Sequence, residues 1–208
     1  MRSITRFARA CWELRSEALS HARERRITLT SQSIEPTLSE PTEIALVTRS
    51  ALNLKLRPVT HADAKIVEEL FDGLAPEDMR FRFLSSRRHL PPEQLAEMIG
   101  VDHRHAEHLL AFDAVSSRLV ASLMIVADQH MQDAEVAIAV KPNYKGRGIG
   151  WTLLKHAADL ARERELRRLR SIESRANHQA MEVERTLGFK VVDYEGDATL
   201  ALVEVEFT

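Results

Sequence analysis

Hydrophobic and polar positions follow two periodicities along this chain, and each predicts a type of element. Apolar residues at alternate positions or in short runs predict strands at residues 54–58, 108–113, 119–128, 134–140, 169–173 and 199–207. Apolar residues three and four positions apart predict helices after Thr60 and over 151–165 and 177–187, and prolines at 76 and 91–92 predict two shorter ones. Strands grouped early, with helices on both sides of a mixed sheet, predict an α+β fold.

The N-terminal quarter differs in composition from the rest. Residues 1–26 carry seven arginines against three glutamates, with apolar residues at helical spacing, which predicts a separate arginine-rich helix. Residues 27–48 contain no lysine or arginine but many threonines, serines and glutamates, so 27–53 is predicted to be a linker. The core domain is then expected to span 54–208.

Composition and charge exclude several classes of protein. A net charge of −2 provides no general attraction to nucleic acid or to an anionic membrane, so neither is expected as a partner. No apolar run approaches the ~20 residues of a membrane span. One cysteine, Cys11, excludes an internal disulfide. These features predict a cytoplasmic protein, and a homodimer is compatible with them.

The segment from Glu135 to Gly150 is the most informative in the chain, because an apolar strand leads into a basic, glycine-dense loop followed by a helix predicted from Trp151. Glycines let backbone N–H groups approach a ligand, and a helix start adds unpaired donors, so this order predicts a phosphate site. A Walker loop would need Gly-Lys-Ser/Thr, which is absent. A dinucleotide fingerprint would need the third glycine one residue later than Gly150.

The spacing Lys145-x-x-Gly148-x-Gly150 resembles the pyrophosphate loop of the GNAT superfamily of acyl-CoA-dependent N-acyltransferases. A second signature agrees, because Asn177-His-Gln-Ala180 followed by Leu187-Gly-Phe189 is similar to that family's Asn-x-x-Ala helix and Gly-Phe ending. The resemblance covers about residues 54–208. It implies a mixed, mostly antiparallel sheet, acetyl-CoA as cosubstrate and no metal.

The resemblance also implies which residues bind the cofactor. The pyrophosphate would lie on the backbone of the loop, the pantetheine amides would pair with the preceding strand, and Asn177 would contact the CoA arm. The implied residues are Ile138, Ala139, Val140, Lys145, Gly146, Arg147, Gly148, Ile149, Gly150 and Asn177. From its position alone, Asn177 is also expected to cap a helix. His103, His105 and His108 are expected to form a polar turn rather than a metal site.

Glu135 is the candidate catalytic base, with Asp133 and Glu173 as alternatives. An amine must lose a proton to attack a thioester, and Glu135 begins the strand that leads to the loop. Its apolar neighbours are expected to raise its pKa by desolvation. A glutamate at this position also resembles the base of lysine-acetylating members of the family.

The proton donor for the leaving thiolate is less clear from the sequence. Many members of the family carry a tyrosine four residues before the Gly-Phe glycine, but Glu184 occupies that position here. The only tyrosines are Tyr144 and Tyr194. Either the thiolate leaves unaided or Tyr194 folds back toward it.

The arginines at 162, 164, 167, 168 and 170 are expected to form a solvated helix end.

Two short matches narrow the resemblance to the GNAT domains of bacterial protein-lysine acetyltransferases: Leu74-Ala-Pro-Glu77 and Arg82-Phe83. The expected activity is therefore transfer of an acetyl group to a primary amine, either of a small molecule or of a protein lysine. A non-catalytic CoA-binding sensor or assembly module is the alternative. A nucleic-acid-associated protein that uses the arginine-rich segment is a further one, testable by salt-dependent DNA binding.

Overall fold

A computed structural model describes residues 43–86 and 88–207, which include one compact unit beginning at Glu43. The sheet has eight strands in the order β1-β2-β3-β4-β5-β6-β8-β7. The strands are β1 (Ile44–Val47), β2 (Asn53–Pro58), β3 (Ala106–Asp113), β4 (Leu119–Ala127), β5 (Asp133–Val140), β6 (Arg168–Ser174), β7 (Lys190–Asp193) and β8 (Leu200–Glu206). All neighbouring pairs are antiparallel except β5 and β6.

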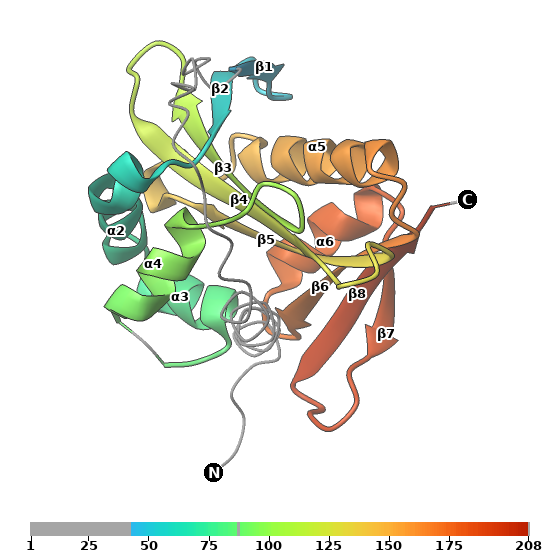
Figure 1. The fold of residues 1–208 in the computed structure, drawn as a ribbon. Coiled ribbons are helices and arrows are strands. Elements are labelled where there is room, and N and C mark those ends of the chain that lie inside the picture. Colours follow the sequence, from blue (N-terminus) through green and yellow to red (C-terminus); the bar gives the residue numbers. More distant parts are fainter. Residues whose placement is uncertain (1–42, 87, 208) are drawn as a thin grey trace, which may run out of the picture. The chain divides into compact units, whose positions relative to one another are not determined.

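Helices cover both faces of this sheet, as predicted (Figure 1). They are α2 (Ala64–Asp72), α3 (Pro76–Phe83), α4 (Pro92–Ile99), α5 (Ile149–Glu163) and α6 (His178–Thr186), with short 3-10 turns η1 (His61–Asp63) and η2 (Pro142–Tyr144). Helices α2, α3 and α4 lie on one side of the sheet, and α5 and α6 lie on the other. The mixed α+β fold expected from the sequence is therefore confirmed.

The main hydrophobic cluster lies between α5 and the sheet. The buried face of α5, which includes Leu153 and Ala157, packs in one cluster with Leu123 and Ile125 of β4. The intervening β4 residues face the other way, where Ser122 bonds to the fully buried His108 at 2.9 Å and His108 bonds to the Met98 carbonyl of α4 at 2.7 Å. This alternation fixes which face each β5 side chain occupies.

The start of the core domain differs from the sequence prediction. The predicted linker ran to residue 53, but Ile44–Val47 form strand β1 at the edge of the sheet. Ile44 and Leu46 are half-buried against the core, and Glu43 forms a 3.1 Å ion pair with Lys55 on β2. The predicted arginine-rich helix, Cys11 and the remainder of the predicted linker up to residue 42 lie outside the described residues.

Two further details were not anticipated. Strand β7, from Lys190 to Asp193, was missed, because a four-residue edge strand with one half-buried side chain has no readable periodicity. Helix α5 begins at Ile149 instead of Trp151, because Gly148 already serves as its N-cap. Within the described range, no helix has the length and apolar character needed to cross a bilayer.

Candidate active site

Strands β5 and β6 separate part-way along their length. They pair only where Asp133–Glu135 lie beside Arg168–Arg170, although β5 continues to Val140 and β6 to Ser174. A cavity of about 340 Å³ opens in the gap and is lined by Val136–Val140 and by Ser171–Glu173. Because the edge of β5 that faces the gap has no strand partner beyond Glu135 within the described residues, its backbone groups are available to an extended ligand.

The glycine loop closes one end of this cavity. Gly146 and Gly148 adopt left-handed backbone angles, with φ of 72° and 74°, which an L side chain rarely tolerates. The Gly148 carbonyl accepts the Thr152 N–H at 3.0 Å, so α5 starts immediately and its first N–H groups have no partner within the helix. Of the loop residues, Lys145, Gly146, Gly148, Ile149 and Gly150 line the cavity.

Arg147 is not among the residues that line the cavity, although it was predicted to bind the cofactor. Its guanidinium lies 5.0 Å from the centre of the Tyr144 ring. The Tyr144 hydroxyl in turn donates to Asp113 at 3.3 Å. The Arg147 side chain therefore packs against Tyr144, while its backbone remains part of the loop.

The turn between β1 and β2 supports the loop from outside the cavity. The Ser50 hydroxyl donates to the Arg147 carbonyl at 2.7 Å, and the Arg49 guanidinium stacks 3.7 Å from the centre of the Trp151 ring. A Cβ added at Gly148 would lie 3.4 Å from the Arg49 backbone nitrogen. Sequence reasoning missed these contacts because it assigned this turn to the linker; the apolar alternation of Ile44 and Leu46 was the available signal.

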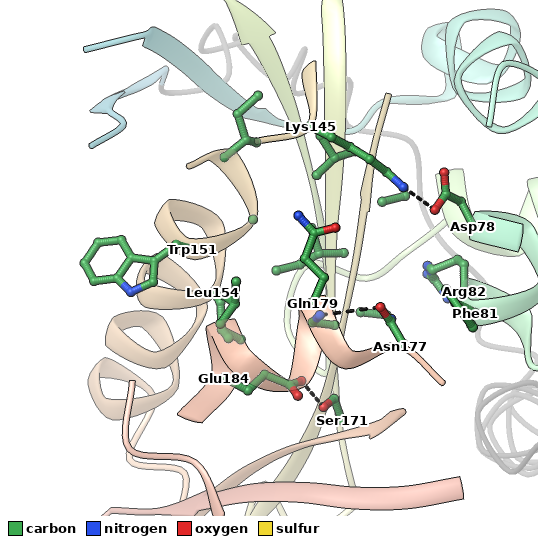
Figure 2. A pocket seen from close by; sticks show the side chains of 18 of the residues that line it. Asp78, Phe81, Arg82, Lys145, Trp151, Leu154, Ser171, Asn177, Gln179 and Glu184 are labelled. Atoms are coloured by element: carbon green, nitrogen blue, oxygen red, sulfur yellow. Dashed lines mark hydrogen bonds and ion pairs between the residues drawn. The ribbon is translucent and has the colours of Figure 1, made fainter. Parts of the chain in front are cut away.

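Lys145 forms an ion pair with Asp78 of α3 across the mouth of the cavity (Figure 2). The Asp78 side chain is 16% exposed, and its Oδ2 atom has no hydrogen-bond partner within the described residues. Lys145 is among the residues predicted to bind the cofactor, and its charge is balanced by a carboxylate that also lines the cavity.

Asn177 has two roles in the structure. Its Oδ1 atom accepts the Ala180 N–H at 3.4 Å and caps α6, as predicted from its position. Its Nδ2 atom donates to Glu173 Oε2 at 2.8 Å, and both side chains line the cavity. Burial raises the pKa of Glu173 to about 7, against the opposing effects of the Asn177 hydrogen bond and the Arg82 charge.

Glu184 extends from α6 into the base of the cavity, where Figure 2 shows it beside Ser171. It is 4% exposed, and its Oε1 atom accepts a hydrogen bond from the Ser171 hydroxyl. Burial raises the pKa of Glu184 to about 8, and the nearby Glu173 charge adds to this effect. Tyr194, the alternative proton donor considered from the sequence, does not line the cavity.

Glu135 lies at the last paired position of β5, where the two strands begin to diverge. It stands opposite Val126 of β4 and therefore shares the face of the sheet that α2, α3 and α4 cover. It is 9% exposed, and its Oε1 atom lies 3.6 Å from Arg170 Nε. Glu135 is not among the residues that line the cavity, so it lies beside the closed end of the gap and not within the cavity.

The arginines predicted to form a solvated helix end are only partly solvated: Arg162 and Arg167 are exposed, whereas Arg164, Arg168 and Arg170 are half-buried in ion pairs. Arg168 bridges Asp133 and Glu204 at 3.2 Å to each, and Arg170 lies 3.7 Å from Asp133. Arg164 forms a 2.9 Å ion pair with the buried Glu107. Sequence reasoning missed this because the partners are distant along the chain, and the arginines tie β5, β6 and β8 together at the closed end of the gap.

The histidine cluster divides among separate partners. His103 bonds to Glu107 at 2.8 Å, His105 bonds to Asp102 at 2.9 Å, and His108 is buried under α4. No group of three potential ligands that could hold a metal ion occurs within the described residues.

Taken together, these features form a slot that suits a long, phosphate-bearing thioester. The loop and helix start supply N–H donors and a positive dipole for a pyrophosphate. The open edge of β5 suits the amide groups of an extended arm. Buried carboxyl groups lie on both sides of the sheet, Glu135 on one side and Glu184 on the other.

Comparison with known proteins agrees with this geometry. The sequence model described as the acetyltransferase (GNAT) family matches residues 71–189, which is more than half of the chain. An acetyltransferase of Pseudomonas aeruginosa is 25% identical over 136 residues, covering 64% of this chain and 73% of that protein.

Solved structures share the fold. The GNAT domain of S. lividans PAT superposes with a TM-score of 0.72 at 23% identity, covering 79% of this chain and 97% of that domain. The spermidine N-acetyltransferase of Vibrio cholerae, solved with CoA and spermine, superposes with a TM-score of 0.60 at 16% identity, covering 74% of this chain and 95% of that one. On the family match, the split sheet and the glycine loop, this chain belongs to the GNAT family of acetyltransferases.

Proposed function

We propose that this protein moves an acetyl group from acetyl-CoA to a primary amine by direct attack of the amine on the thioester. The observation that carries the proposal is the gap between β5 and β6, which has the glycine loop at its open end and Glu135 at its closed end. The acceptor is either a small molecule or a protein lysine. Membership of the family supports the reaction type, and the choice of acceptor rests on experiment.

In this proposal the cofactor lies along the slot and runs from the glycine loop toward the point where β5 and β6 diverge. Its pyrophosphate rests on the N–H groups from Lys145 to Gly150, and its pantetheine arm pairs with Ile138–Val140. Asn177, which lines the opposite side, contacts the arm. The thioester then lies near the point where the strands diverge. This places the reacting carbonyl deep in the slot, where water is excluded and an amine can be held against it.

Glu135 serves as the general base. It must be ionised to accept a proton, and the guanidinium of Arg170, 3.6 Å away, favours the charged form of the carboxylate. Because Glu135 faces the side of the sheet covered by α3, the amine would approach from that side. Since the side chain lies beside the cavity, proton transfer through one water molecule fits the arrangement.

A direct assay tests this function. The protein is mixed with acetyl-CoA and a panel of amines that contains spermidine, an aminoglycoside and a lysine-rich peptide, and release of the CoA thiol is measured. Acetylated product is then identified by mass spectrometry. Binding of acetyl-CoA by calorimetry without turnover of any amine would favour a non-catalytic CoA-binding module instead.

A further inference from the structure

We propose that Glu184 is the proton donor for the thiolate that leaves acetyl-CoA. This inference deepens the proposed function and rests on it. The motivating geometry is a carboxyl group at the base of the cavity, 4% exposed, that hydrogen-bonds through one oxygen and has no hydrogen-bond partner for the other among the described residues.

The contacts of Glu184 favour the neutral carboxylic acid. The Ser171 hydroxyl donates to Oε1, while Oε2 is buried without a partner. A charged carboxylate in that setting would leave a buried, unsatisfied anionic oxygen, which is costly. A protonated Oε2 avoids that cost and presents an O–H group that can donate. Burial and the Glu173 charge raise the pKa of Glu184 to about 8, which agrees with this protonation state.

The neighbouring Glu173 is better suited to remain ionised. Burial raises the pKa of Glu173 only to about 7, below that of Glu184, because the 2.8 Å hydrogen bond from Asn177 to Oε2 and the Arg82 charge of α3 oppose the effect of burial. From α5, the cavity is lined by Trp151 and Leu154, which carry no charge. Glu173 is thus the charged neighbour that acts on Glu184, and two buried carboxyl groups in one cavity divide into one acid and one carboxylate.

A proton donor at this place would ease the departure of the thiolate, and the steps of the reaction balance with Glu184 in that role. The amine nitrogen forms a bond to the acetyl carbon and loses its proton to Glu135. The carbon–sulfur bond then breaks, and its electron pair goes to sulfur. The Oε2 proton of Glu184 moves to that sulfur and yields the CoA thiol. Solvent later returns a proton to Glu184 and removes one from Glu135, so the reaction is balanced.

The two carboxyl groups lie on opposite faces of the sheet, which fits their separate tasks. Glu135 shares the face of Val126, whereas Glu184 belongs to α6 on the other face, where Trp151 of α5 bonds to Thr186 of α6 at 3.1 Å. An amine that enters from one face and a thiolate that leaves toward the other are each beside their own proton-transfer group.

The test compares Glu184→Gln with the wild-type protein, using acetyl-CoA and hydroxylamine. Hydroxylamine is neutral at pH 7 and needs no base to make it nucleophilic, so its use isolates the departure of the thiolate. We expect kcat to fall by roughly 10²-fold, at the low end for a proton-transfer group, with an unchanged KM for acetyl-CoA. Glutamine keeps the shape and can still accept the Ser171 hydrogen bond, so a structural role alone predicts little loss.

The pH profile supplies a second readout. Wild-type kcat is expected to fall above about pH 8 as Glu184 ionises, and Glu184→Gln should lack that alkaline decline. Glu173→Gln should move the decline to lower pH, because it removes the negative charge that raises the pKa of Glu184. If the wild-type protein turns over but Glu184→Gln matches it in kcat and in pH profile, the proposal is overturned while the function stands. If the wild-type protein transfers to no amine, both are overturned.

Discussion

The ammonium of Lys145 pairs with the carboxylate of Asp78, and this contact joins the glycine loop to helix α3 across the mouth of the cavity. The Lys145 charge is therefore balanced, and the other basic side chain of the loop, Arg147, lies outside the cavity lining. We expect phosphate binding at this site to rely on backbone N–H groups more than on the charge of Lys145.

This contact leads to the first prediction. Asp78→Asn should tighten CoA binding several-fold at low salt, because it removes a negative charge near the phosphates and frees Lys145. Lys145→Ala should weaken binding, since it leaves the Asp78 carboxylate unbalanced. Calorimetry at two salt concentrations measures both effects. Equal affinities for the wild-type protein and Asp78→Asn at low salt would mean that the pyrophosphate lies away from this pair.

Gly148→Val should abolish CoA binding while the fold persists. The backbone φ of 74° disfavours any side chain, and the added Cβ would lie 3.4 Å from the Arg49 nitrogen. Gly196→Val is the matched control, because Gly196 has a φ of 92° in a turn outside the cavity lining. Both variants should lose stability, but only Gly148→Val should lose CoA binding in calorimetry. Undiminished affinity in Gly148→Val would remove the loop from the cofactor site.

Glu135→Gln should lower kcat by roughly 10²–10⁴-fold with an amine that is protonated at neutral pH. High pH should partly restore activity, because it deprotonates the amine directly. Asp133→Asn is the control: Asp133 also pairs with Arg168 and Arg170, but it lies further into the paired part of β5. Steady-state kinetics across pH measure both variants. If Asp133→Asn alone lost activity, Asp133 and not Glu135 would be the general base.

Stability should fall as pH rises from about 5 to about 8. The pKa of Glu184 is raised to about 8 and that of Glu173 to about 7, against 4.5 for an ordinary glutamate. The folded protein thus holds protons that the unfolded chain has released, so the stabilisation is complete below about 4.5 and is lost through pH 7–8. Glu184→Gln should flatten this slope and raise Tm at pH 8 by several degrees, since each kcal/mol is worth about 2–4 °C.

Glu182→Gln is the control for that measurement, because Glu182 is exposed on the same helix. It should leave the pH dependence of thermal unfolding unchanged. A Glu184→Gln protein with the wild-type slope between pH 5 and 8 would show that Glu184 is ionised in the folded state, and it would count against its role as proton donor as well.

The sequence predicted the parts of the site whose signals are local. The loop of Gly146 and Gly148, the strand before it and the cap at Asn177 each depend on residues a few positions apart, so spacing alone reveals them. The order and type of the main helices and strands could be predicted for the same reason, because periodicity is a local signal. Periodicity placed Glu135 near the start of a strand, but its place at the end of the β5–β6 pairing, beside the cavity and not in its lining, depends on the tertiary fold.

Contacts between distant segments could not be predicted in this way. Lys145 and Asp78 are 67 positions apart, and nothing local marks them as partners. The burial of Glu184 depends on how α6 docks against Ser171 of β6, so no local feature of the sequence marked it. Strand β1 was not predicted, because it lies in a stretch whose threonines, serines and prolines are typical of a linker.

Because Ser50 and Arg49 of the β1–β2 hairpin support the loop and the start of α5, docking of the hairpin should be coupled to CoA binding. If the docked hairpin raises the affinity of the loop for CoA, bound CoA must stabilise the docked hairpin by the same free energy, because coupling between two sites is reciprocal. CoA should therefore slow amide exchange at Leu52, whose N–H donates to Thr48 at 3.1 Å although it lies outside the cavity lining. A shortened protein intended to retain cofactor affinity should accordingly keep Glu43 and every residue after it.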